Sequence, residues 1–111
     1  MDTLVQHKEI VRQLILEHAA YKPSYGEIEP EVIIDEAKGH YELLQMGWQG
    51  PRRVHSAAIH IDIIDGKIWV QYDGTSPGVA QELLDAGIPR EMIVLGFRPP
   101  HLRQYTGFGV A

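Results

Sequence analysis

The chain has 111 residues and a formal net charge of −5, with 44% hydrophobic residues and no cysteine. This length and composition predict one folded domain spanning residues 1–111 and exclude a disordered chain. The absence of cysteine excludes thiol catalysis, thiolate metal sites and disulfides. No run approaches the ~18 apolar residues of a membrane span, and the N-terminus lacks a basic segment leading into an apolar run. We therefore expect a cytoplasmic protein that does not contact membranes.

The charge is spread unevenly along the chain. Residues 1–50 carry four basic and nine acidic side chains, whereas residues 51–111 carry six of each. Binding to duplex DNA usually requires a strongly basic face, so this balance argues against a domain that holds DNA alone. The best candidates for anion or DNA contacts are Arg52, Arg53, Arg98 and Arg103, because guanidinium groups bind phosphates and carboxylates bidentately. Alternatively, these arginines form ion pairs with acidic side chains in the first half of the chain.

The first predicted element is an amphipathic helix. Thr3 and Gln6 have the spacing of a capping box. Apolar residues then recur at helical spacing, and Pro23 prevents continuation beyond about Tyr21. We expect His7 and His18 to lie on the surface without partners, and residues 21–26 to form a loop.

Two hairpins are predicted next. Residues 32–34 and 41–48 read as strands joined around Gly39, and a three-residue loop is favoured because a two-residue turn would place Asp35 opposite Glu42. The second hairpin turns at Asp65-Gly66, a pair typical of a type I′ turn. From the turn outward, this register pairs Ile64 with Lys67, Ile63 with Ile68, Asp62 with Trp69, Ile61 with Val70, His60 with Gln71, and Ile59 with Tyr72.

The remaining elements are short. Ser76 as N-cap and Pro77 at the first position predict a helix over 76–86 that ends at Gly87. A helical turn over 89–91, a buried extended segment over 92–95 and a proline-opened turn or short helix over 98–105 follow. These elements predict an α+β fold, in which an antiparallel meander of two successive hairpins packs against the first helix and the 76–86 helix. An exposed hairpin edge could also pair with a second copy, which predicts a homodimer.

No constellation indicates catalysis. His60 and Asp62 have the spacing of two ligands from an iron facial triad, but such enzymes need a second histidine and a larger double sheet. The glycines from Gly74 to Gly78 lack the lysine and spacing of a phosphate loop. We therefore expect no catalytic residue, no metal site and no cofactor, and interpret His60 and Asp62 as part of a solvated or partner-facing surface.

A polar strand face is the best candidate for contact with a partner protein. The predicted register places Trp69 beside His60, Asp62 and Gln71, and tryptophan is enriched where proteins dock. The alternative for Trp69 is cover by the chain's own loops. Trp48 is expected in the core or at its rim.

Several motifs occur in order through essentially the whole chain: Tyr-Lys-Pro-Ser-Tyr-Gly at 21–26, Arg-Arg-Val at 52–54, His60 followed by Asp62, Asp-Gly-Lys-Ile-Trp at 65–69, Asp-Gly-Thr at 73–75, Ile-Val-Leu-Gly-Phe at 93–97 and Arg-Gln-Tyr-Thr at 103–106. Together they closely resemble the XisI family, the fdxN element excision controlling factors of cyanobacteria. Gly109 is a small departure from the family's Phe-Ala-Val ending. The resemblance implies an accessory role in site-specific excision of a DNA element, beside a separate recombinase and a companion protein called XisH.

Three functional interpretations follow from the sequence. The leading one is a non-enzymatic controlling factor that acts through an XisH-like companion. An antitoxin-like inhibitor of a nuclease-like companion is a variant of it. The second is a directionality factor that binds DNA directly through its arginines, and the third is a metal-dependent enzyme that uses His60 and Asp62.

Overall fold

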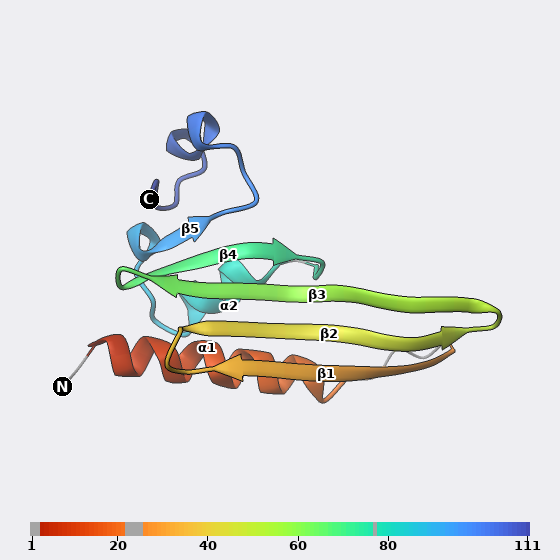
Figure 1. Ribbon diagram of the computed structural model, residues 1–111. Coiled ribbons are helices and arrows are strands. Elements are labelled where there is room, and N and C mark those ends of the chain that lie inside the picture. The colour runs from red at the N-terminus through yellow and green to blue at the C-terminus, as the bar shows by residue number, and fades with distance from the viewer. Residues whose placement is uncertain (1–2, 22–25, 77) are drawn as a thin grey trace.

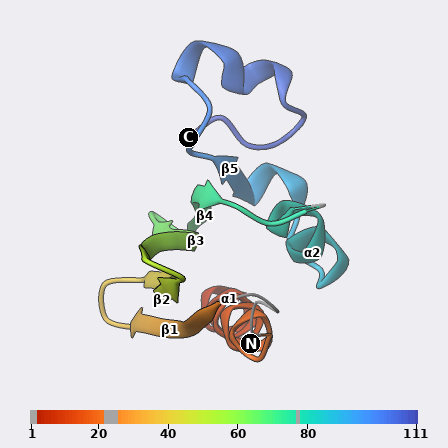
Figure 2. The same ribbon diagram turned by 90° about the vertical axis from the view of Figure 1, so that its right-hand side faces the viewer.

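A computed structural model describes residues 3–21, 26–76 and 78–111. Its elements in chain order are α1 (Thr3–Ala19), β1 (Glu27–Asp35), β2 (His40–Gln49), β3 (Arg52–Ile64), β4 (Lys67–Asp73), α2 (Val79–Asp85), the 3-10 turn η1 (Arg90–Met92), β5 (Ile93–Leu95) and the 3-10 turn η2 (Pro100–Tyr105). The strands form one sheet in the order β1-β2-β3-β4-β5, and both α-helices lie on the same face of it (Figures 1 and 2). The α+β architecture predicted from the sequence is confirmed. No described helix has the length and apolar character needed to cross a bilayer.

The sheet is mixed rather than wholly antiparallel. β1 to β4 form the predicted meander, but β5 pairs parallel to β4, with Ile68 opposite Ile93 and Val70 opposite Leu95. A parallel strand requires a crossover, and the segment containing α2 supplies it. The short segment predicted over 92–95 therefore becomes the last strand of the sheet.

The hydrophobic core lies between the helices and the inner face of the sheet. Val11, Leu14 and Ile15 of α1 and Val79 and Leu83 of α2 contribute to the same buried cluster. Alternate strand residues face it because successive side chains of a strand point to opposite faces. The buried strand residues of this cluster are Tyr41, Leu43, Ile59, Ile61, Ile63, Ile68, Val70 and Ile93.

Neither histidine of α1 is an unpartnered surface residue, because His7 is buried and His18 contacts α2. His7 is only 6% exposed, and the His18 ring nitrogen Nε2 lies 2.8 Å from Oε2 of Glu82 on α2. The sequence-based expectation of unpartnered surface residues is therefore wrong for both. The His18 partner lies 64 positions along the chain, so helical periodicity could not reveal it.

The first hairpin turns over four residues, 36–39, rather than the three predicted. Asp35 pairs with His40, and the Asp35 carboxylate accepts a hydrogen bond of 3.1 Å from the Lys38 amide. Gly39 adopts the expected positive φ of 65°. Asp35 is not opposite Glu42, so the like-charge pair is avoided as predicted.

The second hairpin follows the predicted register only near its turn. Asp65 and Gly66 have φ values of 51° and 79°, as a type I′ turn requires, and the four predicted pairs nearest the turn are present. Beyond them the register shifts between His60 and Ile61, so His60 faces Tyr72 and Ile59 faces Asp73. The predicted pairs of His60 with Gln71 and Ile59 with Tyr72 are wrong because Gln71 is an extra residue in β4.

The start of α2 also differs from the prediction. The helix begins at Val79 with Gly78 at the N-cap, and no N-cap side chain bonds to it. The Asp73 carboxylate takes that role, because Oδ2 accepts a 2.8 Å hydrogen bond from the Val79 amide and Oδ1 accepts one of 2.9 Å from the Thr75 amide. Ser76 is therefore not the cap. Pro77, like most of the predicted 21–26 loop, lies outside the described residues.

We predict that Asp73→Ala lowers the free energy of unfolding by about 2 kcal/mol, because the amide of the fully buried Val79 loses its acceptor. Ser76→Ala should change stability by less than ~0.5 kcal/mol. Urea unfolding of the two variants measures the difference. Asp73→Asn, which keeps an acceptor oxygen, should recover part of the loss, and a larger loss in Ser76→Ala than in Asp73→Ala would contradict the assignment of the cap.

A second prediction concerns Gly47 in β2. Gly47 has a φ of 151°, and a Cβ at this position would overlap the carbonyl oxygen of Glu27 on the paired strand β1. Gly47→Ala should therefore separate β1 from β2 locally and cost roughly 3 kcal/mol or more, as severe backbone clashes do. Gly50→Ala is the matched control, because Gly50 also has a positive φ but open space around its Cα, so it should cost only about 1 kcal/mol. Equal chevron-derived stabilities for the two variants would refute this explanation.

Candidate functional site

The outer face of the sheet, opposite α1 and α2, is polar at its centre. Alternation along each strand places His40 and Glu42 of β2, His60 and Asp62 of β3, and Trp69 of β4 on this face. In the edge view of Figure 2, neither α1 nor α2 covers it. The register sets His40, Asp62 and Trp69 side by side in one row across three strands, and sets Glu42 beside His60 in the neighbouring row.

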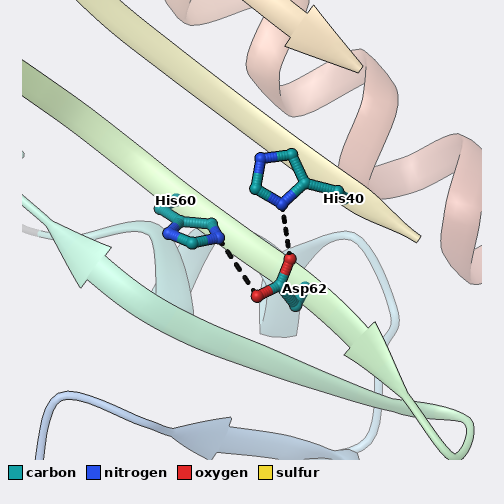
Figure 3. A group of neighbouring side chains, drawn as sticks. All are labelled: His40, His60 and Asp62. Atoms are coloured by element: carbon teal, nitrogen blue, oxygen red, sulfur yellow. Dashed lines mark hydrogen bonds and ion pairs between the residues drawn. The ribbon is translucent and has the colours of Figure 1, made fainter. Parts of the chain in front are cut away.

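Four of these residues form what we call the histidine–carboxylate cluster: His40, Glu42, His60 and Asp62. The Asp62 carboxylate directs one oxygen toward each imidazole ring, and the two ring centres lie 4.7 Å apart (Figure 3). Its Oδ1 is 2.8 Å from His40 Nδ1, and its Oδ2 is 3.1 Å from His60 Nε2. His40 Nε2 in turn lies 3.2 Å from Glu42 Oε2. The side chains are 20–31% exposed, so the cluster is partly withdrawn from water but open to it.

The carboxylates change the proton affinity of His40. Burial of the ring opposes its protonation, but hydrogen bonds to Asp62 and Glu42 and the negative charges of both favour the charged ring. The pKa of His40 is therefore raised above its ordinary value. A protonated His40 would offset part of the negative charge of the two acids.

His60 makes fewer hydrogen bonds than His40 does. Its Nε2 atom is buried and, within the described part of the chain, has no aligned hydrogen-bond partner, although Asp62 Oδ2 is close enough for an ion pair. Oδ2 instead accepts a hydrogen bond of 3.3 Å from the Gln71 amide nitrogen. One carboxylate oxygen therefore faces two neighbours, and the Gln71 side chain is the better aligned of them.

Of the four predicted partner-binding residues, His60, Asp62 and Gln71 meet in one place. Trp69 adjoins them but is half-buried, because the Arg103 guanidinium carbon lies 5.0 Å from the centre of its ring. Arg103 also donates to the carbonyl oxygens of Arg98 and Gly96 at 3.1 and 3.3 Å. The chain's own C-terminal segment thus covers part of Trp69, and contact with a partner stays a prediction.

The sequence reasoning missed His40 and Glu42. It placed His40 in the loop of the first hairpin. It considered Glu42 only as the residue that a two-residue turn would set opposite Asp35. The available signal was a pair of matching patterns, His-x-Glu at 40–42 and His-x-Asp at 60–62, on strands that become antiparallel neighbours. Trp48, expected in the core or at its rim, is 49% exposed and therefore not in the core, and Arg53 lies 5.4 Å from its ring centre.

The four candidate arginines do not form one patch. Arg52 and Arg53 lie at the far end of the long β2–β3 hairpin, which extends beyond the helices in Figure 1. Arg53 and Asp62 are nine positions apart along β3, or roughly 30 Å along a strand. Arg98 and Arg103 belong to the C-terminal segment beside Trp69. There Arg98 borders a cavity of about 400 Å³ that is also lined by Leu95, Leu102, Tyr105 and Thr106.

Comparison with known proteins identifies the fold family. A model of the XisI protein family matches residues 1–110. The crystal structure of a XisI-like protein from Anabaena variabilis ATCC 29413 superimposes with a TM-score of 0.91 at 43% identity, covering 98% of this chain and 100% of that one. The fdxN element excision controlling factor XisI from the same organism gives a TM-score of 0.85 at 32% identity, covering 99% and 100%. None of the curated proteins compared matches. The chain belongs to the XisI family.

Proposed function

We propose that this protein is a non-enzymatic accessory factor in the excision of a DNA element, and that it acts by binding a companion protein of the XisH type. The name of the Anabaena relative, an excision controlling factor, supports the first part. The acidic composition supports the second, because a chain with a net charge of −5 is repelled by phosphates. We propose the cytoplasm as its location, because a DNA element is excised where the chromosome lies.

The observation that carries the proposal is the helix-free outer face of the sheet. Partly buried His60, Asp62 and Gln71 lie beside Trp69 at its centre, and Arg98 with Tyr105 lies on the C-terminal segment that borders it. Tyrosine, tryptophan and arginine are the residues that most often dominate protein–protein binding energy. We propose that the companion covers this face and contacts the border residues.

Charge favours a protein partner over DNA. The acids Glu42 and Asp62 lie at the centre of the face, and Arg103, the arginine that packs on Trp69, also donates to two carbonyl oxygens. The exposed Arg52 and Arg53 stand at the opposite end of β3. Neutralising several phosphates needs several basic groups on one surface, and a complementary protein surface needs only a few well-placed ones.

The test measures the affinity of the co-purified companion for variants of this chain. Trp69→Ala should raise the Kd roughly 30-fold, the equivalent of a loss of about 2 kcal/mol at an interface hot spot. Trp48→Ala is the matched control, since Trp48 is exposed at the far end of the hairpin and should bind as wild type does. Arg98→Ala, at an exposed position, gives a second variant that needs no repacking and should also weaken binding. Calorimetry gives the affinities, and circular dichroism checks folding.

Two outcomes would reject the proposal. One is separate migration of the two proteins after co-expression, with Trp69→Ala and Arg98→Ala indistinguishable from wild type. The other is tight binding of the element's DNA ends by the chain alone, with an affinity that falls steeply as salt is added.

A growth experiment separates control of excision from an antitoxin-like role. If the chain restrains a nuclease-like companion, the companion expressed alone should arrest growth and co-expression of this chain should restore it. Trp69→Ala should then restore growth less well than Trp48→Ala, because the same surface makes the contact. Normal growth of cells that express the companion alone would exclude the antitoxin-like role and leave the accessory role in place.

A further inference from the structure

We infer that His40, His60 and Asp62 form a binding site for one late first-row divalent metal ion, with Zn²⁺ as the best match. The inference goes beyond the proposed function and does not rest on it. Three ligand atoms converge on one point, neighbouring side chains orient them, and His60 Nε2 lacks an aligned hydrogen-bond partner in the described residues.

The three ligand atoms converge on the outer face. One ligand atom from each residue lies within 4.8 Å of the other two, and Figure 3 shows the two rings turned toward the same carboxylate. Zinc bonds to histidine nitrogen and carboxylate oxygen are about 2.0–2.2 Å long, which sets the ligand atoms of a tetrahedral site roughly 3.4 Å apart. Small side-chain rotations must therefore open the histidine–carboxylate contacts of 2.8 and 3.1 Å and close any wider pair as the ion enters. Two imidazoles and one carboxylate form a common donor set for catalytic zinc, and one that other late first-row ions also accept.

The ligands are already oriented by neighbours. His40 Nε2 faces Glu42 Oε2 at 3.2 Å, so Nδ1 is the nitrogen that would bind an ion, in place of its present 2.8 Å hydrogen bond with Asp62 Oδ1. The Gln71 amide holds Oδ2 of Asp62 and leaves Oδ1 toward His40. Metal-binding histidines commonly donate their second ring N–H to a carboxylate, and such outer partners fix both the tautomer and the direction of the ligand. Glu42 and Gln71 stand in these positions.

The bonding of His60 points to a missing partner. A buried polar atom almost always has a hydrogen-bond partner, and an exception calls for a water, an ion or strain. His60 Nε2 is buried without an aligned partner in the described residues, and it is one of the atoms that faces Asp62. An ion bound between His60 and Asp62 would satisfy this nitrogen.

Selectivity follows from the donor atoms. With three protein ligands, a four-coordinate ion keeps one open position, which the 20–31% exposure of these side chains leaves accessible to water. Mg²⁺ prefers six oxygen ligands and has little affinity for imidazole, so it should not bind.

The experiment uses the full chain without a histidine tag, stripped with a chelator and dialysed. Calorimetric titration with ZnCl₂ should give one ion per chain, and titration with CoCl₂ should give visible ligand-field absorption that ZnCl₂ abolishes. His40→Gln and His60→Gln should each weaken Zn²⁺ binding at least tenfold. Glu42→Gln should weaken it by about tenfold, the usual effect of losing an outer partner. His55→Gln is the matched control, because His55 is exposed on the same strand β3, seven residues from Asp62, and should bind as wild type does.

Two results would overturn the inference. The first is wild-type protein that gives neither a Zn²⁺ binding heat nor Co²⁺ absorption. The second is binding that persists unchanged in His40→Gln, His60→Gln and Glu42→Gln, which would mean adventitious binding by other surface groups. If a histidine variant fails to fold, Glu42→Gln and the wild-type Co²⁺ spectrum decide. MgCl₂ should produce no effect. Because the chain is tested alone, a failure here would leave the companion-binding proposal untouched.

Discussion

The long antiparallel pairing of β2 with β3 is the constraint on which the rest of the structure depends. It sets Tyr41 opposite Ile61 on the inner face, where both are fully buried, and His40 opposite Asp62 on the outer face. A slip of one residue would exchange the faces, burying the charged groups and exposing the core. The burial of the apolar side chains therefore holds the polar cluster in register, and the helices need contribute nothing to the cluster directly.

Two irregularities in the sheet lie beside this cluster. The β2–β3 register shifts between Leu43 and Leu44, and the β3–β4 register shifts between His60 and Ile61. A bulge leaves one residue outside the ladder and re-aims its side chain. In β4 that residue is Gln71, whose amide reaches Asp62. With regular pairing Gln71 would sit opposite His60, so the bulge changes which polar group the glutamine serves.

The sequence was most informative where structure is local. Asp65-Gly66 specified its turn and the four nearest pairs, because a type I′ turn demands positive φ from residues that tolerate it. Interactions distant in sequence were beyond reach. Asp73 caps α2 in place of Ser76, and His18 pairs with Glu82, because the tertiary arrangement brings them together. The same holds for the candidate site: His60 and Asp62 share one strand and were recognised, whereas His40 arrives from another strand.

The composition of the outer face carries a physical consequence for function. Partly burying two carboxylates and two imidazoles costs desolvation energy, which such groups recover only through mutual bonding. Here the recovery is uneven, since His40 is bonded at both ring nitrogens while His60 shares its carboxylate oxygen with Gln71. Replacing these groups by apolar ones would stabilise an isolated sheet but expose a hydrophobic patch. A polar face whose hydrogen bonds are incomplete gains more from binding a ligand or a partner than from contact with water alone. Because this face lies opposite the core, such binding would leave the packing of the fold undisturbed.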